Sequence, residues 1–150
     1  MAKVSAIPVP SDSLLAGFGG SRDYRDCFVR EVRGAVSLPD LIERFYCSAA
    51  FRPERIILGL IGSGASNEDA RALARGDADG IALWNVIERR DHEILLEAPS
   101  TGTASWLSVE PHEGTTRLLF GSWVRELDQS GWRFMQRAHE WYSRVLLGGL

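Results

Sequence analysis

The residue best suited to chemistry is His139, which lies in a long apolar-faced segment at residues 129–147. At about 100° per residue this segment predicts a helix, in which Met135 and Tyr142 share the apolar arc and His139 stands at its border. An imidazole titrates near neutral pH, so His139 is a candidate general acid or base. The commoner role for such a histidine is structural, as a helix-edge residue hydrogen-bonded to a sheet.

Alternation of apolar and polar residues predicts the sheet that this helix would cover. The predicted strands cover residues 24–33, 81–89, 93–98, 103–110 and 115–124. Short connections make the last four strands antiparallel neighbours. Helices are predicted at 38–49, where Ser37 and Asp40 form a capping pattern, and at 53–61, while residues 66–76 predict a solvated helical turn. This order of elements predicts an α+β domain of two layers.

Two assumed turns decide which side chains face the predicted C-terminal helix. A two-residue turn between the second and third strands puts Asn85, Ile87 and Leu96 on one face. A four-residue loop between the last two strands adds a further set to that face: Ser105, Leu107, Val109, Leu118, Phe120 and Ser122. Apolar walls with a few polar groups suit a small-molecule site, although such groups also commonly bond nearby backbone. The predicted ligand-binding residues are Asn85, Ile87, Leu96, Leu107, Phe120, Ser122, Met135, His139 and Tyr142.

Three of the five tryptophans fall on the opposite face under the same register. Trp84, Trp106 and Trp123 would then form an outer aromatic cluster, and such clusters usually mark an interface or a covered patch. We expect residues 1–22 or a second copy of the protein to cover them. If the register is displaced by one residue, the tryptophans fill the core instead.

Composition narrows the class of protein. The 150 residues are 45% hydrophobic with a net charge of −3, which fits one globular domain at 23–150 preceded by an extended arm at 1–22. Neither a basic stripe nor a long apolar run is present, so we expect neither nucleic-acid nor membrane partners. We expect a cytoplasmic protein. Cys27 and Cys47 lack metal-ligand spacing and predict two buried thiols, with no metal and no cofactor.

The element order resembles the helix-grip fold of the START/SRPBCC superfamily, which includes the birch pollen allergen, lipid-transfer domains and polyketide cyclases. The resemblance is closest to bacterial single-domain members of unknown function, and it rests on short motifs spread along the chain. These are Asp23-Tyr24-Arg25-Asp26, Leu38-Pro39-Asp40, Phe45-Tyr46, Ala104-Ser105-Trp106-Leu107 and His139. It implies an antiparallel sheet wrapped on a long C-terminal helix, with an apolar ligand held between them. Five predicted strands, where the fullest members have seven, would make that cavity shallow.

Three functions follow from these patterns. The first is a non-catalytic module, monomeric or dimeric, that binds a small apolar or aromatic molecule between the sheet and the last helix. The second is a cyclase-like or dehydratase-like enzyme in which His139 is the acid or base, assisted by Tyr142 and Asn85. The third is an interaction module that works through the outer tryptophans and holds no ligand.

Overall fold

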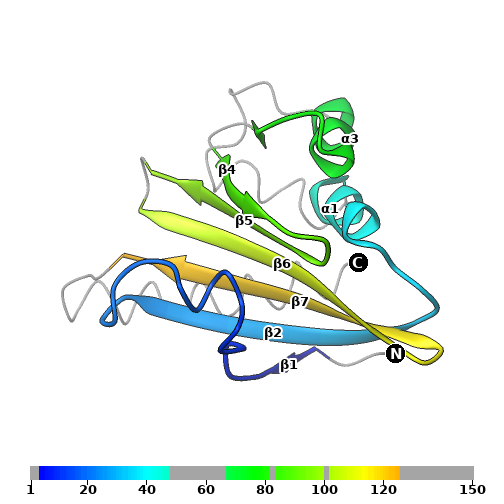
Figure 1. The fold of residues 1–150 in the computed structure, drawn as a ribbon, viewed down its shortest axis with the longest axis horizontal. Coiled ribbons are helices and arrows are strands. Elements are labelled where there is room, and N and C mark those ends of the chain that lie inside the picture. The colour runs from blue at the N-terminus through cyan, green and yellow to red at the C-terminus, as the bar shows by residue number, and fades with distance from the viewer. Residues whose placement is uncertain (1–3, 48–66, 82–83, 100–101, 126–150) are drawn as a thin grey trace.

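The computed structural model describes residues 4–47, 67–81, 84–99 and 102–125. This part of the chain forms a seven-stranded antiparallel sheet in the order β1-β2-β7-β6-β5-β4-β3, with two short helices (Figure 1). The strands are β1 Ser5–Ala6, β2 Tyr24–Arg33, β3 Gly80–Ile81, β4 Trp84–Arg89, β5 Glu93–Ala98, β6 Thr103–His112 and β7 Thr115–Val124. The helices are α1 Leu38–Cys47 and α3 Asn67–Arg75. The predicted α+β class is therefore confirmed.

Some predictions concern parts of the chain outside the described residues. These are the helices at 53–61 and 129–147 and, with the latter, the side chains of Met135, His139 and Tyr142. Among the helices that the structure describes, none is long and apolar enough to span a bilayer.

All five predicted strands are present, and two more lie at the edges of the sheet. β1 pairs with β2, and β3 pairs with β4 through Ile81 and Trp84. Each extra strand has two residues, which is too short for a repeating pattern to be visible in the sequence. The predicted strand at 81–89 is accordingly two strands, β3 and β4. The predicted count of five strands is wrong because this division adds one strand and β1 adds another.

The beginning of α1 and the end of α3 are both marked by signals in the sequence. Ser37 Oγ accepts from the Asp40 N–H and Asp40 Oδ2 accepts from the Ser37 N–H, each at 3.2 Å, which is the predicted capping box of α1. α3 ends at Gly76 (φ +81°), where the Asp77 N–H donates to the Ala72 carbonyl in a Schellman motif.

The prediction of a solvated helical turn at 66–76 is wrong. α3 packs against α1 and buries Ala70, Leu73 and Ala74, since these small and medium side chains lie three and four residues apart on one face. Arg89 of β4 fastens the helix end to the sheet by donating to the carbonyls of Leu73 and Ala74 at 2.8 and 2.7 Å.

The β6–β7 hairpin confirms the predicted faces although its turn is tighter than predicted. His112 pairs with Thr115, so the connection has two residues, the second being Gly114 at φ +76°. This changes the predicted register by two residues, and an even change leaves every side chain on the same face. The set Ser105, Leu107, Val109, Leu118, Phe120 and Ser122 therefore shares one side of the sheet.

The β4–β5 hairpin contradicts part of the prediction because β4 contains a bulge between Val86 and Glu88. One extra residue reverses the faces of the strand that precedes it. Asn85 and Ile87 are consequently exposed, and Ile87 at 47% is the large hydrophobic most open to solvent among the described residues. Trp84 and Val86 take the inner positions that were predicted for Asn85 and Ile87. The assignment of Asn85 and Ile87 to the inner face, and of Trp84 to the outer one, is wrong.

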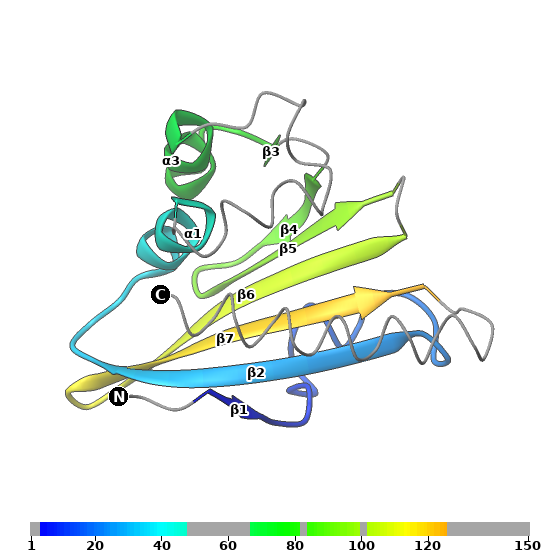
Figure 2. The same cartoon turned by 180° about the vertical axis from the view of Figure 1, so that it is seen from behind.

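Each side of the sheet carries its own core. We call the first the helix side, where Phe28, Leu96, Leu107 and Phe120 form one cluster with α1 and α3. We call the second the tryptophan face, which comprises Cys27, Leu95, Ala104, Trp106, Leu119 and Trp123. It is covered by residues 13–20, here named the strap. Figure 1 shows the strap in front of β7 and β2, and in the reverse view of Figure 2 it lies behind them.

Candidate functional site

The helix side has an apolar wall across the middle of the sheet. Phe28, Phe120, Leu107 and Ile94 are cross-strand partners in one row over β2, β7, β6 and β5, and each is at most 2% exposed. From above, the ring of Phe45 in α1 stacks on Phe120 with centroids 5.0 Å apart.

The next row along the strands is polar. Asp26 of β2 pairs with Ser122 of β7, and Ser122 pairs with Ser105 of β6, so three polar side chains cross the helix side next to the apolar wall. Tyr24, two residues before Asp26 and on the same face, donates its hydroxyl hydrogen to Asp26 Oδ2 at 2.8 Å. We call these four residues the polar row.

Ser122 is the distinctive member of the polar row. Its side chain is fully buried, and within the described part of the chain its Oγ has no hydrogen-bond partner. A buried hydroxyl without a partner costs about 1–3 kcal/mol. Thr116, on the same face of the same strand, shows the usual situation: its Oγ1 donates to the Gly34 carbonyl and accepts from the Val36 N–H.

Four of the predicted ligand-binding residues are brought together by the structure. Leu96, Leu107, Phe120 and Ser122 lie on the helix side, and a ligand role for them stays a prediction. Two do not join them, Asn85 and Ile87, because of the bulge in β4. Sequence reasoning missed Tyr24 and Asp26. Both are an even number of residues from the buried Phe28 in the same strand, so the alternation of faces along β2 could have put them on the side of the sheet that Phe28 occupies. Which strand β2 would pair with was not visible in the sequence.

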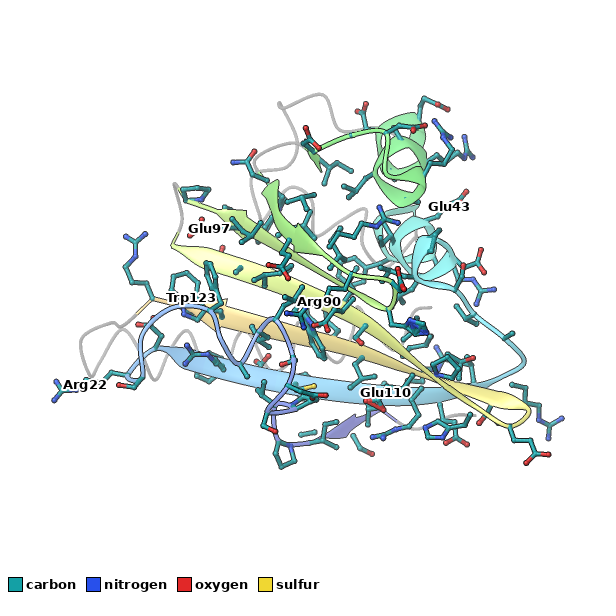
Figure 3. The ribbon with its side chains drawn as sticks, viewed as in Figure 1. Arg22, Glu43, Arg90, Glu97, Glu110 and Trp123 are labelled. Carbon is teal, nitrogen blue, oxygen red and sulfur yellow. The ribbon has the colours of Figure 1, made fainter. Side chains whose placement is uncertain are left out.

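The tryptophan face is closed by the N-terminal arm, the first of the two coverings predicted. Trp106 and Trp123 are 2% and 4% exposed, and Trp84 lies in the other cluster. Figure 3 shows Trp123 beside the strap, whose Phe18 meets the indole edge to face with centroids 4.8 Å apart. The indole N–H groups of Trp106 and Trp123 each donate to a carboxylate at 2.9 Å, respectively Glu93 Oε1 and Asp23 Oδ2.

The thiol of Cys27 lies beneath the arm and is buried, as predicted; the side chain of Cys47 is outside the described residues. Burial, with the nearby carboxylates of Asp26 and Glu110 adding to it, raises the pKa of the Cys27 thiol to about 12. It is therefore a neutral, unreactive thiol at physiological pH. No cluster of three or more histidine, cysteine or acidic side chains suited to a metal ion occurs in the described ranges.

Comparisons with protein-family models, with curated proteins and with solved structures give no match. The two sides of the sheet therefore supply the chemistry from which a function can be inferred.

Proposed function

We propose that this chain is a small-molecule-binding protein of the helix-grip type, which holds an apolar or aromatic ligand against the helix side of its sheet. The observation that supports this most directly is the buried Ser122 hydroxyl, which lacks a partner among the described residues and adjoins an apolar wall. Apolar walls that surround a few polar groups are typical of ligand sites. The order of one long strand, helices and an antiparallel meander also agrees with the START/SRPBCC resemblance.

The polar row indicates what one end of the ligand should carry. The Asp26 carboxyl group accepts a hydrogen bond from the Tyr24 hydroxyl, while the Ser122 and Ser105 hydroxyls can donate or accept. A ligand with a hydroxyl or phenol group could donate to Asp26 and exchange hydrogen bonds with Ser122, while its apolar body lies on Phe120 and Leu107. In this proposal the predicted helix at 129–147 closes the site, with Met135, His139 and Tyr142 toward the ligand.

The test begins with native mass spectrometry of the protein purified from its host, followed by denaturing release of any bound molecule. We expect a reproducible small apolar mass that carries at least one hydroxyl group. Ser122→Ala should lose about tenfold in affinity for the released molecule, since one buried hydrogen bond contributes about 0.5–1.5 kcal/mol. Ser108→Ala is the matched control, because Ser108 is also buried but its side chain lies on the tryptophan face, where its cross-strand partner is Leu119. Equal affinities for the two variants would contradict the proposal.

A cyclase-like or dehydratase-like enzyme is the second candidate, and the Tyr24–Asp26 pair favours it. Their hydrogen bond of 2.8 Å puts a phenol and a carboxylate beside Ser122, so proton-carrying groups lie on the helix side independently of His139. Loss of turnover of a polyketide-like substrate in His139→Ala, with ligand binding retained, would support the enzyme. Retained turnover in that variant would contradict the role proposed for His139.

A further inference from the structure

The tryptophan face contains a socket that one leucine fills. Trp106, Gly121 and Cys27 are cross-strand partners in one row over β6, β7 and β2, so the glycine leaves a gap between an indole and a thiol. Leu15 of the strap occupies the gap and is fully buried. A Cβ placed on Gly121 would lie 2.5 Å from Leu15 Cδ2 and 2.9 Å from Trp106 Cε3. The socket therefore exists only because residue 121 has no side chain.

Phe18, three residues after Leu15 in the same turn, is a second anchor of the strap. The Phe18 N–H donates to the Leu15 carbonyl at 3.2 Å, which brings the side chains of residues 15 and 18 to the same side of the strap. Leu15 enters the socket, and Phe18 packs on Trp123. Two apolar anchors at positions i and i+3 thus fix the strap on the face.

The remaining contacts are hydrogen bonds from side chains of the sheet to the main chain of the strap. Glu93 Oε1 accepts from the Leu14 N–H at 2.7 Å, and the same oxygen accepts from the Trp106 indole. Arg25 of β2 donates to the carbonyls of Leu15 at 3.3 Å and Gly20 at 3.0 Å, and also to that of Phe18. These bonds involve only main-chain N–H and carbonyl groups of the strap, so they do not depend on its side chains. Any peptide with the same turn could form them.

We infer that the tryptophan face is a peptide-recognition surface and that the strap is its intramolecular ligand. Its partner is a peptide turn that presents a leucine and, three residues later, an aromatic ring. The strap keeps the surface closed, and a peptide of the same chemistry binds when the strap leaves.

The hydrogen bonding of the strap favours its release as a unit. Two of its described backbone–backbone bonds run within the arm, from the Ser13 N–H to the Pro10 carbonyl and from the Phe18 N–H to the Leu15 carbonyl, and a third closes the turn before β2, from the Asp23 N–H to the Gly20 carbonyl. The bonds that join it to the tryptophan face go through the side chains of Glu93 and Arg25 and through Asp23, whose Oδ2 accepts from both the Gly20 N–H and the Trp123 indole. Segments with few ladder bonds to the rest of a fold open locally at a lower free energy than the sheet itself.

The experiment uses the full chain with Leu15→Ala, which empties the socket from the strap side and leaves the surface unchanged. The probe is a fluorescein-labelled peptide of residues 10–22 with the natural sequence, and binding is followed by fluorescence anisotropy. We expect the variant to bind this peptide at least about tenfold more tightly than the wild-type protein does, since truncating a buried leucine removes much of its burial energy. A peptide that itself carries Leu15→Ala should lose at least about tenfold in affinity for the same reason.

Two matched variants decide what a positive result means. Leu14→Ala makes the same chemical change one residue away and leaves the socket filled. Because Leu14 is only half-buried at the edge of the tryptophan face, this variant should gain much less affinity for the peptide than Leu15→Ala does. Gly121→Ala should not bind it, because the new methyl group occupies the socket. Binding to Gly121→Ala as tight as to Leu15→Ala, or no binding to a folded Leu15→Ala, would overturn the inference.

Amide hydrogen exchange of the wild-type protein tests the same inference without a variant. We expect the N–H groups of Leu14 and Gly20 to exchange at least about tenfold faster than those in the middle of β7, as local opening requires. Protection of the strap equal to that of β7 would show that the strap opens only with the whole fold, and would overturn the inference even if Leu15→Ala failed to fold.

Discussion

The two sides of the sheet are buried in different ways. On the helix side, two helices pack on a broad apolar cluster, and the polar row contains a hydroxyl without a partner among the described residues. On the tryptophan face, one irregular segment does the covering, and the two indole N–H groups are both bonded to carboxylates. The helix side is covered through apolar packing, and one of its buried polar groups lacks a partner among the described residues. The tryptophan face is covered by a single segment, and both of its indole N–H groups are hydrogen-bonded.

This difference separates two kinds of binding. An unpartnered hydroxyl in an apolar wall is favourable only when another molecule or segment supplies the missing bond, which suits a small ligand. A surface on which carboxylate and guanidinium groups bind main-chain atoms suits a peptide. The two proposals thus assign a different recognition chemistry to each side of the sheet, and substitutions on one side test one proposal at a time.

The largest effect should come from the apolar wall of the helix side. Phe120→Ala removes a ring that stacks on Phe45, and we expect a loss of about 3–5 kcal/mol in the free energy of unfolding. Phe18→Ala, the matched change on the strap, should cost only about 1 kcal/mol, the size of an aromatic pair contact, because Phe18 is half-buried. Urea unfolding measures both variants. Equal losses would remove the distinction between the two sides.

Leu15→Ala should cost less than its complete burial suggests. We expect about 2 kcal/mol, the low end for a buried leucine, because the variant can release the strap instead of keeping a cavity. Release would hydrate Cys27 and move the pKa of its thiol down from about 12, since burial is the largest cause of the raised value. Alkylation by iodoacetamide at pH 8, in a Cys47→Ser background, should therefore become faster. An unchanged rate would show that the strap stays in place.

Glu93→Gln should weaken the strap by about 1–2 kcal/mol, because two hydrogen bonds to a charged oxygen become bonds to a neutral amide. The indole N–H resonance of Trp106 should shift, and the resonance of Trp123, which donates to Asp23, should not. Glu97→Gln, four residues along β5 and on the same face, is the control. A shift of both indole resonances in the control would mean that the overall charge is responsible.

The smallest loss of stability should follow Ser122→Ala. Removing a hydroxyl that has no partner in the described part of the chain also removes its desolvation cost, so the free energy of unfolding of the ligand-free protein should stay the same or rise by up to about 1–3 kcal/mol. Thr116→Val provides the contrast, since it leaves the Val36 N–H without its acceptor and should cost about 1–3 kcal/mol. A large loss in Ser122→Ala would show that its hydroxyl is already bonded.

Much of the sheet could be predicted because its long strands repeat the alternation of apolar and polar residues many times. An error of two residues in a turn also leaves the faces of the strands unchanged. β2 coincides with the strand predicted at 24–33, and the faces of β6 and β7 survived a wrong turn length because the error was two residues. The bulge at Ile87 changed the register by one residue and could not be foreseen, since an isoleucine carries no sign of a bulge. That single residue exchanged Asn85 for Trp84 on the helix side.

Less of the candidate site could be predicted, because it depends on pairing between strands far apart in the sequence. Ser122 was found through its own hairpin, which is local. Asp26 reaches Ser122 only because β2 lies beside β7, a contact across 96 positions of the chain that no local pattern encodes. Likewise, the sequence suggested that the arm covers the tryptophans, but the match between Leu15 and Gly121 required coordinates.

The bulge in β4 also bears on how this protein avoids sticking to copies of itself. Within the described residues the bonds on the outer edge of β4 stop at Val86, whose N–H donates to the Asp79 carbonyl, so the residues that follow could template a further strand. An extra residue at Ile87 bends the strand there, and the charged side chains of Glu88 and Arg90 follow it. A straight edge strand invites cross-β stacking, and deleting Ile87 would straighten β4 while leaving its charged side chains in place. The bulge that obscured the register is therefore one of two features of this strand that oppose such stacking.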